Sequence, residues 1–72
     1  MNEKSRTFTI NDFKTLQLRL LNAHTQHDGS ELQKLDAEII NTYQRTTMDS
    51  RQYKVLSNTC GIFLDDWREN WK

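Results

Sequence analysis

The chain contains no proline and only two glycines, Gly29 and Gly61, in 72 residues. Proline and glycine are the residues that most often interrupt regular structure. Their scarcity leaves long stretches in which a helix meets no break, and no window shows the apolar and polar alternation of a strand. The sequence therefore predicts an all-α fold, a small helical hairpin or three-helix bundle.

The first helix is predicted over residues 9–25. Thr9 with Asp12 three residues later has the pattern of a capping box, and Phe8 with Phe13 has the spacing of a hydrophobic staple. At 100° per residue, the apolar side chains that follow fall within an arc of about 160°, which we expect to be buried. These side chains are Ile10, Phe13, Leu16, Leu20, Leu21 and Ala23, with Leu18 outside the arc.

The second helix is predicted over residues 30–46, after a turn formed by residues 27–30. Ser30 with Gln33 is a candidate cap, and two β-branched threonines, Thr46 and Thr47, favour an end near this point. The apolar residues that share one narrow face are Leu32, Leu35, Ile39 and Tyr43, with Ile40 beside them.

The third helix is predicted over residues 49–71. Asp49 with Gln52 forms another capping pattern, and Met48 with Tyr53 another staple. Its main apolar stripe consists of Tyr53, Leu56, Cys60, Phe63, Leu64, Trp67 and Trp71. Gly61 inside this helix costs about 1 kcal/mol relative to alanine, which predicts either a close approach of another helix or a local weak point.

We expect residues 1–72 to form a single domain with a thin core and a frayed start at residues 1–7. Ile, Leu, Val and Phe make up 16 of 72 residues, about 22%, which is close to the level at which chains stay disordered. One cysteine provides no internal disulfide. No apolar run approaches membrane-spanning length and the first residues are polar, so we expect a cytoplasmic protein that does not enter a membrane.

Three groups of residues have side chains of the types found in metal sites or catalytic sites. His24, His27 and Asp28 have the spacing of metal ligands, but they fall where a helix ends in a polar turn. Cys60 lies on the apolar stripe, where burial suppresses a thiolate. Asp65 and Asp66 are adjacent and diverge by about 100° on a helix. We therefore expect no enzymatic activity, no metal and no cofactor.

A small DNA-binding regulator is the alternative function. Arg51, Lys54 and Asn58 lie on the predicted outer side of the third helix, as the contacts of a recognition helix would. Affinity for nucleic acid comes largely from neutralised phosphates, however, and ten basic residues here balance ten acidic ones. DNA binding is therefore the second choice.

The apolar residues favour a protein-binding function. Tryptophan is concentrated at interface hot spots, and Trp67 and Trp71 stand one turn apart near the end of the chain. The candidate contacts for a partner are Tyr53, Leu56, Phe63, Trp67 and Trp71. An equally simple reading places both tryptophans over the end of the bundle.

We expect a non-enzymatic protein-protein interaction module, such as a small regulator, adaptor, inhibitor or co-chaperone. It would bury apolar helix faces against another protein or a second copy of itself, giving a homo- or hetero-oligomer. The residues that exceed what one small core needs are Val55, Ile62, Leu18 and Ile40. The sequence leaves open whether they face the core or a partner.

Overall fold

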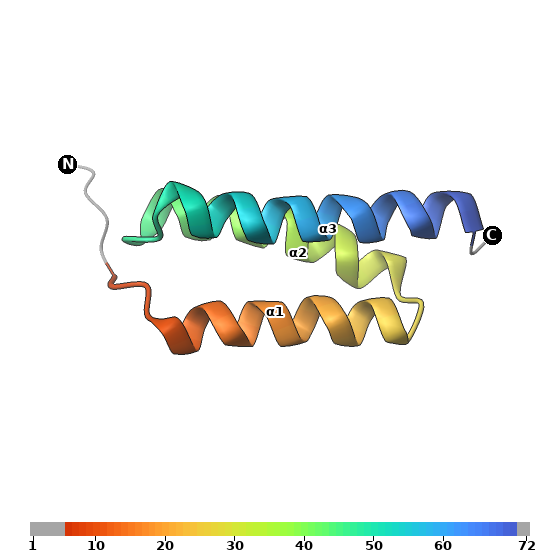
Figure 1. The fold of residues 1–72 in the computed structure, drawn as a ribbon, viewed down its shortest axis with the longest axis horizontal. Coiled ribbons are helices and arrows are strands. Elements are labelled where there is room, and N and C mark those ends of the chain that lie inside the picture. Colours follow the sequence, from red (N-terminus) through yellow and green to blue (C-terminus); the bar gives the residue numbers. More distant parts are fainter. Residues whose placement is uncertain (1–5, 71–72) are drawn as a thin grey trace.

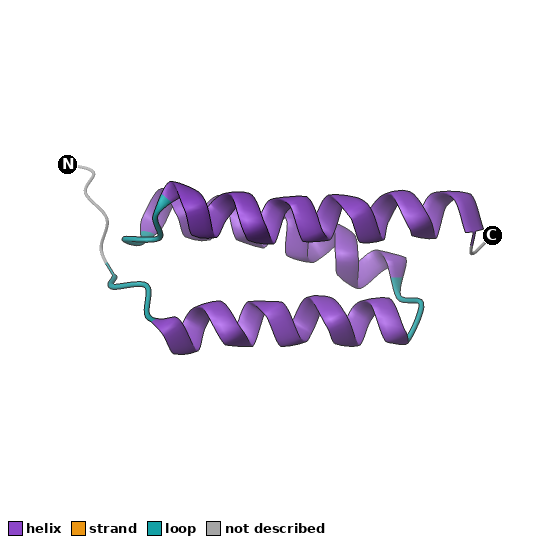
Figure 2. Ribbon diagram, in the orientation of Figure 1, coloured by secondary structure: helices purple, strands orange, loops and turns teal. Residues whose placement is uncertain are grey.

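The computed structural model describes residues 6–70, which form three helices: α1 (Ile10–Thr25), α2 (Gly29–Arg45) and α3 (Ser50–Asn70). The first and third helices run in the same direction, and α2 runs back behind them in the view of Figure 1. Helix dominates these residues (Figure 2), and their only β pairing is an isolated bridge. The predicted all-α bundle is confirmed, and each helix begins within one residue of its predicted start.

Two of the predicted capping boxes are present. The Asp12 amide donates to Thr9 Oγ1 over 3.1 Å and the Thr9 amide donates to Asp12 Oδ2 over 3.0 Å. At α3, the Gln52 amide donates to Asp49 Oδ1 over 2.8 Å and the Asp49 amide to Gln52 Oε1 over 3.2 Å. The bond from the Thr9 amide lowers the pKa of Asp12. These bonds satisfy backbone donors that a helix start would otherwise leave open.

The start of α2 differs from the prediction. Its N-cap is Asp28 rather than Ser30, and Asp28 Oδ1 accepts from the Glu31 amide over 3.1 Å. The preceding helix ends in a Schellman motif, in which the Asp28 amide donates to the Ala23 carbonyl over 2.9 Å. His27 has a φ of 56° and occupies the left-handed position where glycine is usual. Gly29 is therefore not the residue in the left-handed turn; it is the first residue of α2.

Gly29 lies where α2 meets the far end of α3. It is buried, and a Cβ atom built on it would overlap the indole ring of Trp67. A Cβ atom built on Gly61 would meet no atom within 4 Å. Of the two alternatives given for Gly61, the close helix approach is therefore absent, and Gly29 has the glycine-dependent contact instead.

Alanine substitutions at the two glycines should have opposite effects. Gly61→Ala should raise the free energy of unfolding by up to about 1 kcal/mol, because alanine favours helix and the site is open. Gly29→Ala should lower it by about 1–3 kcal/mol, because the added methyl overpacks the Trp67 contact. Chemical denaturation followed by circular dichroism measures both. Equal gains in the two variants would contradict the packing of Trp67 on Gly29.

A single cluster of buried residues joins the three helices. Five partly buried rings pack around it, namely Phe13, Tyr43, Tyr53, Phe63 and Trp67. Its buried members are Phe8, Leu16, Leu20, Ala23, Leu32, Leu35, Ile39, Met48, Leu56, Cys60 and Leu64. Every helix contributes to the cluster, so no pair of helices closes the core alone.

The buried face of α1 is narrower than predicted. Ile10 is 63% exposed and Leu21 is 52% exposed, so the expectation that both belong to the core is wrong. Leu16, Leu20 and Ala23 are the buried residues of α1, and they span an arc of only about 60° at 100° per residue. Two neighbouring helices cover no more of α1 than this, which leaves the edges of the predicted 160° arc in solvent.

Arg19 connects α1 to α2 beside the core. Its Nη1 atom lies 2.7 Å from Glu38 Oε2 and its Nη2 atom lies 3.3 Å from Glu31 Oε2. The hydrogen bond to Glu38 raises the pKa of Arg19. Two carboxylates seven residues apart on one side of α2 thereby hold one guanidinium, and this fixes which side of α1 faces α2.

The segment before α1 is held from Arg6 onward. The Thr47 amide donates to the Arg6 carbonyl over 3.1 Å, and the Phe8 amide donates to Thr47 Oγ1 over 2.9 Å. Phe8 is buried in the core cluster. The loop between α2 and α3 thus provides hydrogen-bond partners on both sides of Thr7, and the fraying expected through residue 7 stays a prediction. Residues 1–5 lie outside the described part of the chain.

Candidate protein-binding surface

The histidines considered as metal ligands occupy two different settings. The His24 ring stacks on the Phe63 ring, with centroids 4.1 Å apart and planes 13° apart, and so belongs to the contact between α1 and α3. His27 is exposed at the left-handed turn. Within residues 6–70, no three His, Cys, Asp or Glu side chains gather as a metal site requires.

Cys60 is a packed core residue, as its place on the stripe predicted. The side chain is fully buried, and Sγ donates to the Leu32 carbonyl over 3.4 Å. Burial, with a smaller contribution from the charge of Asp36, raises the pKa of the Cys60 thiol to about 11. The thiolate that nucleophilic chemistry needs is therefore disfavoured at neutral pH.

This thiol should make the fold sensitive to alkaline pH. The folded pKa is about 11 and the ordinary value is 9.0, so the folded state keeps the proton that the unfolded state loses between these values. Stability from Cys60 is complete below pH 9 and falls as pH rises, by at most about 1.4 kcal/mol per pH unit. Urea denaturation of wild type and Cys60→Ala at pH 7, 9 and 10 tests this, because Cys60→Ala should lose less stability across the series. Parallel losses would show that the thiol does not titrate with unfolding.

The predicted contacts for a partner lie mostly on the inner side of α3. Leu56 is fully buried in the core, so its assignment to a partner surface is corrected: it has no surface to offer in the folded chain. Tyr53 is half-buried and stacks on Tyr43 of α2, with centroids 4.4 Å apart. Phe63 is held by His24, as described above. This stripe therefore joins α3 to its two neighbours.

The structure describes one of the two tryptophans. Trp67 is half-buried and packs over Gly29, which is the placement expected if it covers the end of the bundle. A partner could contact only the exposed part of the Trp67 ring, at the edge of its packing on Gly29. Trp71 lies outside the described residues.

The large apolar side chains that the core leaves exposed gather mainly on one side of the bundle. The exposed set is Ile10, Leu18, Leu21, Ile40, Val55 and Ile62. On α1, the first three lie within an arc of about 80° at 100° per residue, and on α3 Val55 and Ile62 lie within about 20°. Ile40 is on α2 and stands apart from them. From the sequence, Leu18 and Ile62 were expected to exceed what the core needs, whereas Ile10 and Leu21 were expected to be buried in the core.

A shallow groove lies between the exposed apolar side of α1 and the exposed side of α3. Lys14, Gln17, Leu18 and Leu21 of α1 line it together with Thr59 of α3, and its volume is about 370 Å³. Thr59 lies one turn after Val55 and one turn before Ile62, on the same side of α3. We define the α1–α3 face as Ile10, Leu18, Leu21, Val55, Thr59 and Ile62.

Leu18 and Leu21 form a ridge on this face. Both also line a second hollow of about 410 Å³ on the other side of α1, with Thr15, Arg19, Asn22 and Thr25. Leu18 is 66% exposed, so the ridge stands out into solvent. Alternating ridges and grooves of this kind are how one helix surface receives another.

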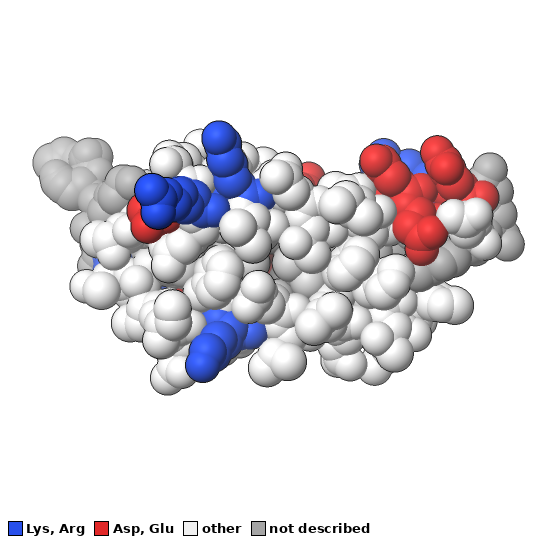
Figure 3. Space-filling model, in the orientation of Figure 1, with Lys and Arg blue, Asp and Glu red and all other residues white. Residues whose placement is uncertain are grey.

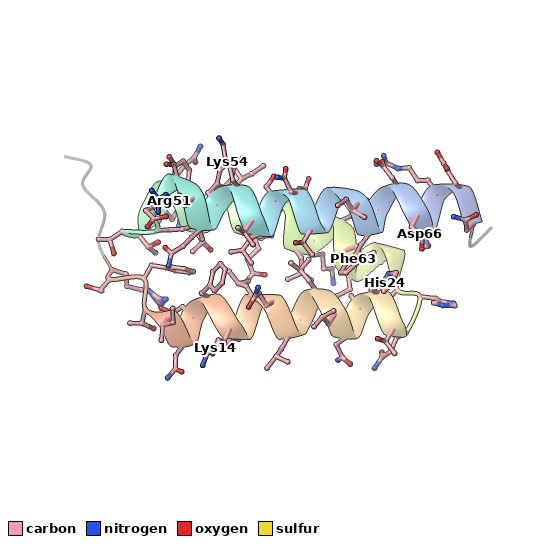
Figure 4. All side chains as sticks on the ribbon, viewed as in Figure 1. Lys14, His24, Arg51, Lys54, Phe63 and Asp66 are labelled. Atoms are coloured by element: carbon pink, nitrogen blue, oxygen red, sulfur yellow. The ribbon has the colours of Figure 1, made fainter. Side chains whose placement is uncertain are left out.

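Charged side chains occupy the two ends of the face and leave its middle uncharged (Figure 3). Lys14, Arg51 and Lys54 lie toward the starts of α1 and α3, and Asp66 lies toward the end of α3 (Figure 4). Between residues 6 and 70, no ion pair involves any of these four or Glu69. Lys14 joins this basic end from α1, which sequence reasoning on α3 alone missed.

The predicted nucleic-acid contacts belong to the same basic end. Arg51, Lys54 and Asn58 are all exposed on the first half of α3. Their predicted position on the outer side of the helix is confirmed. Two of the three are cations, so with Lys14 the end presents three positive charges to solvent.

No family model matches the chain, and no curated protein or solved structure shows significant similarity to it. Across residues 6–70, none of the helices combines the length and apolar character needed to cross a membrane. The features that bear on function are therefore the α1–α3 face and the charges at its two ends.

Proposed function

We propose that the protein is a non-enzymatic protein-binding module that buries the α1–α3 face against another protein surface. The observation that carries the proposal is that five large apolar side chains remain between 46% and 66% exposed on one side of the bundle. Scattered exposed hydrophobic residues are ordinary on a monomer, but a continuous set marks an interaction site.

The core does not need these five side chains. Leu20, Leu32, Leu35, Leu56 and Cys60 are fully buried without them. Covering a large aliphatic side chain contributes about 1.5–3 kcal/mol relative to leaving it in water. The face therefore offers binding free energy that the fold of the single chain leaves unused.

The distribution of polar groups also supports protein binding. Specific interfaces have an apolar centre depleted in charge and a polar rim. Here Leu18 and Leu21 lie toward the middle of α1 and Ile62 toward the middle of α3, and the charges gather toward the two ends (Figure 3). A cytoplasmic regulator, adaptor, inhibitor or co-chaperone would work through such a face with no metal or cofactor.

DNA binding is the second candidate because of the basic end. Lys14, Arg51 and Lys54 could neutralise about three phosphates, which gives a log-log salt slope of about −3 and weak affinity. Asp65, Asp66 and Glu69 at the other end of α3 would repel the same backbone. Nanomolar, sequence-selective binding at physiological salt would place this function first.

Serine substitutions on the face test the proposal. We expect wild type to form a complex, with itself or with a protein from its host lysate, and Leu18→Ser combined with Ile62→Ser to weaken that complex at least tenfold. Native mass by light scattering measures this, alone and after capture from lysate. The double variant should keep its helical circular dichroism, since both side chains are 66% exposed.

Ile40→Ser is the matched control, because Ile40 is an exposed aliphatic residue on α2. It should leave the complex intact. A wild-type chain that stays monomeric and captures nothing would contradict the proposal. Equal damage from Ile40→Ser and from the double variant would contradict the choice of face.

A further inference from the structure

The charges of α3 are separated along its length. Arg51 and Lys54 lie in its first turns, and no Lys, Arg, Asp or Glu follows from residue 55 to residue 64. Its last turns contain Asp65, Asp66 and Glu69 with a single cation, Arg68, which lies 3.9 Å from Asp65. In α1, Asp12 is paired with Arg6 and Arg19 with α2, so Lys14 is the unpaired charge that this helix adds to the basic end. The α1–α3 face is thus basic at one end, uncharged in the middle and acidic at the other (Figures 3 and 4).

Because its two ends carry opposite charges, the α1–α3 face is complementary in charge to a second copy of the same face that runs in the opposite direction. Two copies packed face to face are related by a two-fold axis that lies in the plane of the interface. An axis along the helices would set basic end against basic end. An axis across the helices sets each basic end against the acidic end of the other copy, which is the arrangement that electrostatic complementarity selects.

We propose that the partner of the α1–α3 face is a second copy of this chain, with the two copies antiparallel and α3 packed against α3. The inference rests on the proposed function and adds the occupant and its orientation. The apolar side chains provide the affinity and the end charges choose the direction.

Helix arithmetic gives the register of this dimer. Arg51 and Glu69 are eighteen residues apart, about 27 Å along the helix, and eighteen residues complete five turns, so both lie on the side of α3 that carries Ile62. The antiparallel register centred on residue 60 sets Arg51 opposite Glu69 of the second copy. The pair occurs twice by symmetry, and the uncharged segment with Ile62 falls between the two occurrences.

The side chains that this pair requires are available. Arg51 and Glu69 are exposed and form no ion pair with residues 6–70. Neither side chain has to leave an ion pair of the described residues when the second copy docks.

Single charge reversals and their mixture test the orientation. Arg51→Glu and Glu69→Lys each place like charges opposite each other twice in the antiparallel dimer, so each should raise the dimer dissociation constant about tenfold at low salt. An equimolar mixture restores Glu against Lys and Arg against Glu, and it should return to within about threefold of wild type. Analytical ultracentrifugation of the full chain measures the four samples.

Lys34→Glu is the matched control, because Lys34 is exposed on α2 and the substitution changes the net charge by the same amount. It should leave the dissociation constant unchanged. Circular dichroism establishes that each variant folds. If Glu69→Lys does not fold, Glu69→Arg replaces it in the same design.

The outcomes separate this inference from the proposed function. Wild type that stays monomeric at millimolar concentration overturns the second copy as the partner, and capture from lysate by the same face then decides the proposed function alone. A wild-type dimer that neither charge reversal weakens overturns the antiparallel orientation. A dimer that also survives Leu18→Ser with Ile62→Ser overturns both.

Discussion

The contact between α2 and α3 determines where the α1–α3 face lies. It is held at one end by the stacking of Tyr53 on Tyr43, along its length by buried aliphatic side chains, and at the other end by the packing of Trp67 on Gly29. These contacts turn the aromatic stripe of α3 inward. The outer side of α3, with Val55, is left beside α1 and becomes half of the α1–α3 face.

Local features of the fold were predictable because the interactions that create them span few residues. The capping boxes at Thr9 and Asp49 each join residues three apart, and they placed two helix starts within one residue. The turn before α2 was not predictable in this way. Gly29 is needed under Trp67, 38 positions later in the chain, so His27 takes the left-handed position that glycine would usually fill. A long-range contact overrides the local preference there.

The candidate surface was only partly predictable for a related reason. Helical spacing identifies apolar stripes but not how much of a stripe the neighbouring helices cover. Leu56 therefore looked available to a partner and is buried, whereas Leu21 looked buried and is exposed. Leu18 and Ile62 were identified as surplus because they fall off the main stripes. The groove in which Lys14 and Leu18 of α1 meet Thr59 of α3 depends on the packing of three helices and has no sequence signature.

The central claim is that the α1–α3 face is covered by a second copy while the core is complete in each chain. Methyl chemical shifts followed as the protein is diluted from millimolar to micromolar concentration test it most directly. We expect the methyl groups of Leu18, Leu21, Val55 and Ile62 to shift together along one binding curve, while those of Ile40 and the buried leucines stay constant. Shifts centred on Ile40, or no shift at any methyl group over the whole range, would contradict the claim.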